Sequence, residues 1–253
     1  HLRTRRQRQM CIRDRLIANA LSLHSNGKIK EASEIYNFLI KNKFYDPRVL
    51  NNFGTIYSQI KQFDKAILLF NESIKKFPNS MEAYSNLANV LVIEGKIDTA
   101  KKILKKALEL NPNHLKPYSD LAGICVGERD FKKAEVFLRK SIDINPKDIN
   151  TLVNLACVLK DLGNPKEAEK FLRNALEINP TYEIALTNLG AVLNELEKFD
   201  EGEQYLRKAL TINSSSPMAL NNLGNILSNK KNNSEAEFCY RKAIEIKSDF
   251  SLA

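Results

Sequence analysis

The sequence of 253 residues has few of the residues that build catalytic and metal sites: three His, four Cys and no Trp. It contains no C-x-x-C pair, no Gly-rich phosphate loop and no combination of Ser, His and Asp that suggests a triad. We therefore predict no cofactor, no metal site and no enzymatic activity for this segment, and leave the activity of any longer protein open. Cys125, Cys157 and Cys239 are expected to be reduced thiols that pack as small apolar side chains.

Long apolar stretches are also missing. No window approaches the roughly 18 apolar residues that a transmembrane helix needs. The sequence thus predicts no membrane span and is consistent with a cytoplasmic location.

What the sequence does contain is one pattern that recurs every 34 residues, seven times, without insertion or deletion. A small residue marks each step, at Ala32, Ala66, Ala100, Ala134, Ala168, Gly202 and Ala236. A second small residue stands twelve positions earlier, at Ala20, Gly54, Ala88, Ala122, Ala156, Gly190 and Gly224. A period in this range predicts a solenoid, in which each unit buries its apolar face against its neighbours.

Each unit reads as two helices joined by a turn, as residues 81–114 illustrate. Apolar and small residues first follow the spacing of one helix face, at Tyr84, Leu87, Ala88 and Leu91. A turn at 94–96 follows, and a second run places Ala100, Leu104 and Ala107 on one side. The second run should end at Asn111, because the residue before Pro112 is disfavoured in a helix.

The spacing resembles the tetratricopeptide repeat, and the second unit carries the pattern best, at Leu50, Phe53, Gly54, Tyr57, Ala66, Phe70 and Pro78. The resemblance covers nearly the whole chain, although no Trp occupies the family's Trp position. It implies an all-α fold, a right-handed superhelical solenoid of seven helix-turn-helix units over residues 15–250. The units are expected to start near residues 13, 47, 81, 115, 149, 183 and 217.

The two ends depart from the array. Residues 1–14 resemble the conceptual translation of a transposon-type sequencing adapter, and we interpret them as non-native; the competing interpretations are a basic nucleic-acid-binding arm and a mitochondrial presequence. This segment holds five Arg and one Asp, so without it the net charge falls from +9 to +5. Residues 251–253 occupy the first positions of an eighth unit, which predicts a fragment of a longer repeat protein.

Lys and Arg cluster on the second helices, where they alternate with acids. This pattern is typical of a solvated outer face with i,i+4 ion pairs. An RNA-binding surface would interleave basic residues with exposed aromatics, whereas most aromatics here occupy core positions. We therefore predict no nucleic-acid partner.

A row of amides marks the expected inner surface. In arrays of this family the first helices line a concave groove, and the residue before the Leu-small pair points into it. That residue is Ala18 in the first unit and then Asn52, Asn86, Asp120, Asn154, Asn188 and Asn222; Asn89 and Asn225 follow on the same stripe. An Asn side chain is both donor and acceptor, so it can bridge the N–H and C=O of an extended guest peptide.

This row, here named the Asn ladder (Asn52, Asn86, Asn154, Asn188 and Asn222), resembles the asparagine ladder in the repeat arm of O-linked N-acetylglucosamine transferases. The resemblance implies that the ladder holds a substrate polypeptide, with Asp120 as an interruption. Asn is also the common residue at this position of the repeat, where it can bond a neighbouring helix. The sequence leaves both interpretations open.

The function predicted first is a protein-interaction scaffold whose groove binds an extended peptide or a partner helix. The alternative is the substrate-recognition arm of a larger glycosyltransferase or sulfotransferase. A carboxylate clamp is not supported, because the ladder stripe holds no Lys or Arg and Lys116, near this face, is one turn from Asp120. The identity of the partner and the oligomeric state stay open.

Overall fold

The computed structural model describes residues 2–251, with side chains described for residues 11–246. Within these residues the chain forms fourteen helices and no strand. The first helices of the seven repeats are α1 (Leu2–Ser25), α3 (Pro47–Gln59), α5 (Met81–Ile93), α7 (Leu115–Gly127), α9 (Ile149–Asp161), α11 (Glu183–Glu195) and α13 (Pro217–Asn229). The second helices are α2 (Ile29–Lys41), α4 (Phe63–Lys76), α6 (Ile97–Leu110), α8 (Phe131–Ile144), α10 (Pro165–Ile178), α12 (Phe199–Ile212) and α14 (Asn233–Ser251). The predicted all-α repeat fold is confirmed.

The starts of most first helices coincide with positions that the sequence pattern marks, whereas α1 begins at Leu2 and not near residue 13. Six first helices begin at the residues where units were expected to start, from Pro47 to Pro217. Three second helices, α6, α8 and α10, end directly before an Asn-Pro pair, as α6 does at Leu110. Asn111 then closes an Asx turn by accepting the backbone N–H of Asn113 at 3.2 Å. Asn213 makes the same turn with Ser215 although Ser214 replaces the proline, so the Asn side chain shapes this link.

The small residues lie where the two helices of a repeat approach each other. All fourteen are buried, and the large residue sixteen positions after the first of them fills the space opposite, as Tyr36 does for Ala20. The Tyr36 hydroxyl also donates to the Ala20 carbonyl at 3.3 Å. A β-carbon on Gly190 would lie 2.4 Å from Leu206 Cγ, so the close approach needs glycine there.

The turn between the helices of each repeat contains one residue in the left-handed region. Gly27, Gly95 and Gly163 have φ of 75°, 77° and 78°. At the same position of the other four repeats the structure places Lys61, Arg129, Glu197 and Lys231, with φ between 58° and 63°. The turn geometry is therefore common to all seven repeats, whereas the glycine is not.

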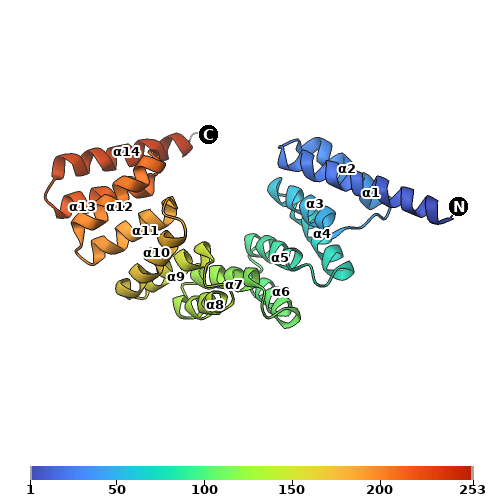
Figure 1. The fold of residues 1–253 in the computed structure, drawn as a ribbon, viewed down its shortest axis with the longest axis horizontal. Coiled ribbons are helices and arrows are strands. Elements are labelled where there is room, and N and C mark those ends of the chain that lie inside the picture. The colour runs from blue at the N-terminus through green and yellow to red at the C-terminus, as the bar shows by residue number, and fades with distance from the viewer. Residues whose placement is uncertain (1, 252–253) are drawn as a thin grey trace. The chain divides into compact units, whose positions relative to one another are not determined.

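The chain divides into two compact parts, residues 2–124 and residues 125–251, named here the N-terminal and C-terminal parts. In Figure 1 the first runs from blue to green and the second from yellow-green to red, and each is a series of helix pairs. A core cluster in the N-terminal part centres on Tyr36, Leu39 and Phe53. One in the C-terminal part centres on Leu206, Leu223 and Ile226.

The ends of the array differ from its interior. Helix α1 continues from Leu2 through residue 14 without a break, and from residue 11 onward, where its side chains are described, Ile17 is the first that is fully buried. Helix α14 has no Asn-Pro stop and continues to Ser251, into the segment assigned to an eighth unit. Residues 252–253 lie outside the described residues. The interpretations of residues 1–14 as non-native and of residues 251–253 as an eighth unit stay predictions.

Candidate functional site

The first helices form the closely packed side of each part. Helix α3 contacts α5 in the N-terminal part, and α11 contacts both α9 and α13 in the C-terminal part. Successive second helices are instead joined through long side chains, as where Arg173 of α10 reaches Glu201 of α12 at 2.7 Å. In the C-terminal part, the direct contacts of the first helices and the long side chains that join the second helices place the first helices on the inner side of the bend. In the N-terminal part, α3 and α5 form the corresponding closely packed side. We call the surface of the first helices that carries the Asn ladder the ladder face.

Three members of the Asn ladder lie on the C-terminal part, one on each first helix. Asn154 of α9 is exposed, and Asn188 of α11 and Asn222 of α13 are half-buried. Among the described residues, Asn154 and Asn222 form no side-chain hydrogen bond. Asn188 donates its Nδ2 to the carbonyl of Ile184 at 2.9 Å and keeps its Oδ1 without a partner. The three amides thus repeat on adjacent helices with most of their hydrogen-bonding capacity unused.

The N-terminal part carries the other ladder residues. Asn52 of α3 and Asn86 of α5 are half-buried, Asn89 is exposed, and none of the three has a side-chain partner among the described residues. Asp120 of α7 differs, because its Oδ1 accepts a hydrogen bond from Lys116 Nζ at 2.5 Å. The carboxylate that interrupts the ladder is therefore already paired with a cation of its own helix.

Other amides near the ladder serve the packing of the repeats. Asn225 accepts a hydrogen bond from the Tyr240 hydroxyl at 2.8 Å, which ties α13 to α14. Asn229 donates to Asn194 Oδ1 at 2.9 Å and so joins α13 to α11. The proposed site residue Asn225 is thus engaged in a structural contact, unlike Asn154 and Asn222.

Of the residues one helical turn before the ladder, sequence reasoning considered Lys116 and missed the others. This position is charged in the N-terminal part, at Arg48, Glu82 and Lys116, and uncharged in the C-terminal part, at Asn150, Ile184 and Met218. Arg48 is paired with Asp46 at 2.9 Å, and Asn150 accepts the Tyr182 hydroxyl at 2.7 Å. Ile184 and Met218 remain 46% and 60% exposed. The 34-residue period could have revealed that this position is charged in the N-terminal part and uncharged in the C-terminal part. The exposure of the Ile184 and Met218 side chains could be seen only in the structure.

Cys157 lies three residues after Asn154 on the ladder face and is half-buried. Burial raises the pKa of its thiol; Lys160 opposes this shift and Asp161 adds to it. The thiol is therefore protonated at neutral pH and is a poor nucleophile. The structure places Cys125 and Cys239 in the core, as the sequence predicted.

The opposite surface, formed by the second helices, is held by a repeated ion-pair motif. Arg139, Arg173 and Arg207 each bind the Glu four residues before them and the Glu twenty-eight residues after them, with N–O distances of 2.6–2.8 Å. The i,i+4 pairs were expected from the sequence, and the links to the following repeat were not. This surface couples neighbouring repeats.

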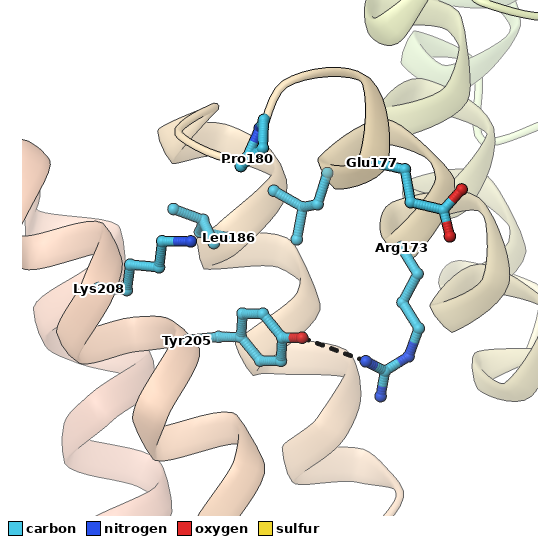
Figure 2. Close-up of a pocket in the computed structure, with 7 residues that line it drawn as sticks. Arg173, Glu177, Pro180, Leu186, Tyr205 and Lys208 are labelled. Atoms are coloured by element: carbon cyan, nitrogen blue, oxygen red, sulfur yellow. Dashed lines mark hydrogen bonds between the residues drawn. The ribbon is translucent and has the colours of Figure 1, made fainter.

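A hollow of about 290 Å³ lies on this surface between α10, α11 and α12. Its lining combines the apolar side chains of Leu176 and Leu186 with the charged side chains of Lys208 and Glu177. Figure 2 shows the Tyr205 hydroxyl facing Arg173, a contact of 3.2 Å. Because Arg173 also binds two glutamates, most of its N–H donors are already used within the two repeats. The hollow is therefore a gap between repeats whose polar lining is already engaged in the ion-pair motif. The ladder face is the stronger candidate site.

No group of three or more His, Cys, Asp or Glu side chains lies together as metal ligands would in the part of the chain that the structure describes. None of the described helices combines the length and apolar character that a bilayer crossing requires.

Family models agree with the repeat geometry. Models described as tetratricopeptide repeat match residues 91–156, 149–182 and 181–249, and a model described as the N-terminal TPR repeats region of Psidin matches residues 6–118. Together these matches extend from residue 6 to residue 249. The chain is a tetratricopeptide repeat protein. No curated protein sequence matches it.

Solved structures share the fold. YrrB, described as a TPR protein with an unusual peptide-binding site, is 25% identical, with a TM-score of 0.57 over 72% of this chain and 94% of YrrB. A tetratricopeptide repeat protein from Parabacteroides merdae is 17% identical, with a TM-score of 0.68 over 92% of this chain and 93% of its own. PilF of Pseudomonas aeruginosa is 15% identical, with a TM-score of 0.67 over 82% and 97%. The last two likenesses concern the fold alone.

Proposed function

We propose that this protein is an interaction scaffold that binds an extended peptide along its ladder face, with the ladder amides holding the main chain of the guest. The observation that carries the proposal is the state of Asn154 and Asn222, whose side chains lie on α9 and α13, on either side of α11 with Asn188, and have no partner among the described residues. An Asn held in the chain's own packing would already have used its donor or its acceptor, as Asn225 does.

The chemistry of the amide suits a peptide main chain. Each Asn offers two N–H donors and a carbonyl acceptor in one plane, and an extended peptide presents N–H and C=O groups at regular intervals. Recognition of this kind does not depend on guest side chains. The likeness to YrrB supports the proposal, because that protein is described as having a peptide-binding site.

The experiment begins with selection of phage-displayed short random peptides against the full chain. The Kd of a selected synthetic peptide is then measured by calorimetry for the wild type and for the Asn154→Ala/Asn222→Ala double variant. If each lost amide removes about 0.5–1.5 kcal/mol, the double variant should bind about 5- to 150-fold more weakly. Asn174→Ala on α10, an exposed Asn away from the ladder face, is the matched control and should leave the Kd unchanged.

Circular dichroism and a thermal melt establish that the variants fold. An unchanged Kd in a folded double variant contradicts the proposal, as does failure to select any peptide. A double variant that has lost its helical array shows instead that the amides are structural, which contradicts the proposal equally.

A further inference from the structure

The ladder face of the C-terminal part has an apolar section next to its amides. Ile184 and Met218 occupy the same position of successive repeats, on α11 and α13, which pack against each other. Each stands four residues before a ladder residue, Asn188 or Asn222, and therefore on the same side of its helix. Two large apolar side chains, 46% and 60% exposed, thus lie beside two amides.

Single exposed apolar residues are ordinary on protein surfaces, so exposure alone indicates nothing. Here the apolar pair lies beside Asn222, which has no side-chain partner among the described residues, and beside Asn188, whose Oδ1 has none. The same position one repeat earlier is Asn150, whose oxygen already accepts the Tyr182 hydroxyl at 2.7 Å. No charged side chain occupies this position in α9, α11 or α13, whereas all three N-terminal counterparts considered above are charged.

A guest chain held by its main chain presents alternate side chains to opposite sides. When its peptide groups lie on Asn188 and Asn222, one side chain in two faces the surface of the first helices, where Ile184 and Met218 stand. A charged side chain there would lose hydration without meeting a counter-ion, while an apolar one would bury surface favourably.

From this arrangement we infer that the C-terminal part selects an extended peptide segment that carries a large apolar side chain for the surface formed by Ile184 and Met218. This inference rests on the proposed peptide-binding function and adds the class of guest. Met218 has a flexible, polarisable side chain that adapts to several apolar shapes, so the preference is for apolar character and not for one residue type.

The test uses the same phage-displayed random peptides. Peptides selected on the wild type should share one position enriched in Leu, Ile, Met or Phe. Replacing that residue by Asp in the synthetic peptide should raise the Kd about tenfold or more, and the Ile184→Glu/Met218→Glu variant should bind the original peptide about tenfold or more weakly. Both positions lie in the first turn of a helix, where an acidic residue is tolerated. A peptide that carries Lys at the shared position should bind this variant more tightly than it binds the wild type.

The matched control is Val136→Glu, which adds a charge at a 57% exposed apolar residue of α8, a second helix, and should leave the Kd unchanged. Selected peptides that depend on Asn154 and Asn222 but show no apolar preference overturn this inference and leave the proposed function standing. Peptides whose binding ignores both amides overturn the proposed function, and this inference with it.

Discussion

At the scale of single residues, the small residue at each helix contact fits the particular side chain that lies opposite it, and the repeat pattern alone does not determine this fit. The sequence predicted that Ala156 and Gly190 would be buried at the helix contact, and both are. It could not tell which of them tolerates a methyl group. That depends on the distance to the side chain opposite, which is Leu206 for Gly190.

Gly190→Ala should therefore destabilise the chain. A β-carbon 2.4 Å from Leu206 Cγ forces side chains and backbone apart, at about 1–3 kcal/mol. This outweighs the gain in helix propensity of about 1 kcal/mol. The reverse change at the equivalent position, Ala156→Gly, should also destabilise, by about 1 kcal/mol, because it removes a buried methyl group and loosens the helix. Urea unfolding midpoints measure both; a midpoint for Gly190→Ala above that of the wild type contradicts the explanation.

Glu169 contributes stability that depends on pH. Its carboxylate accepts hydrogen bonds from Lys198 Nζ at 2.9 Å and Arg173 Nη2 at 2.7 Å. Burial favours a higher pKa, but these two partners outweigh it and the pKa of Glu169 lies below its ordinary value. The pairing is fully effective above the unfolded pKa of about 4.3, and its contribution is lost as the pH falls through the lower folded pKa.

The variant Glu169→Gln should be less stable than the wild type at pH 7 by about 1–2 kcal/mol, a value reduced because both cations are partly exposed. The difference should shrink as the pH is lowered below about 4, where the wild type loses the same charge. Unfolding midpoints of the two proteins across this range measure it. A difference that is the same at pH 7 and pH 3 would show that the charge of Glu169 is not what stabilises the repeat pair.

At the scale of helices and turns, the sequence predicted starts and stops well where the signals are local. Pro47 and Pro217 begin helices, and Asn-Pro pairs end them. Helix α14 is longer than the other second helices because it lacks this signal: Lys247-Ser248 occupies the position of the Asn-Pro pair that ends α6, α8 and α10. The sequence predicted the turn at 94–96, which contains Gly95, but not its left-handed residue, and a charged residue such as Glu197 carries no signal for positive φ.

Glu197→Gly should stabilise the turn between α11 and α12. A left-handed conformation costs a residue with a β-carbon roughly 1–2 kcal/mol, and glycine gives back part of this gain through its larger unfolded entropy. The expected net gain is about 0.5–1 kcal/mol. Gly163→Ala, at the same position of the preceding repeat, should destabilise by a similar amount. Thermal melts test the pair, and a lower midpoint for Glu197→Gly would mean that the Glu197 side chain makes a contribution larger than the backbone strain.

At the scale of the whole molecule, the 34-residue period predicted which residues lie on the ladder face but not their hydrogen bonds. Asn188 and Asn225 use part of their amides within the chain, while Asn154 and Asn222 use none among the described residues. The period places all four alike, and only the contacts of each separate them. The inter-repeat reach of Arg173 to Glu201 was missed for the same reason, because residues twenty-eight apart are neighbours only once the repeats are stacked.

In this account the surface of the second helices stabilises the array, and the surface of the first helices binds the guest. On the second helices, arginines that bind glutamates of two successive repeats couple each repeat to the next, as expected of an array stabilised by neighbouring units. On the first helices, amides without partners and the apolar pair Ile184 and Met218 are left available to a guest. Substitutions on the first helices at these positions should therefore change binding, and those in the ion-pair motif should change stability.

The measurement that tests the central claim most directly is an N-methyl scan of a selected peptide. Methylation of one main-chain nitrogen removes its N–H and leaves the side chains unchanged. The account predicts weaker binding, about tenfold, at the few residues whose main chain lies on the ladder amides, and no further loss at those residues when Asn154→Ala/Asn222→Ala is the binding partner. If every N-methylated peptide binds as tightly as the parent, the ladder does not hold the peptide main chain.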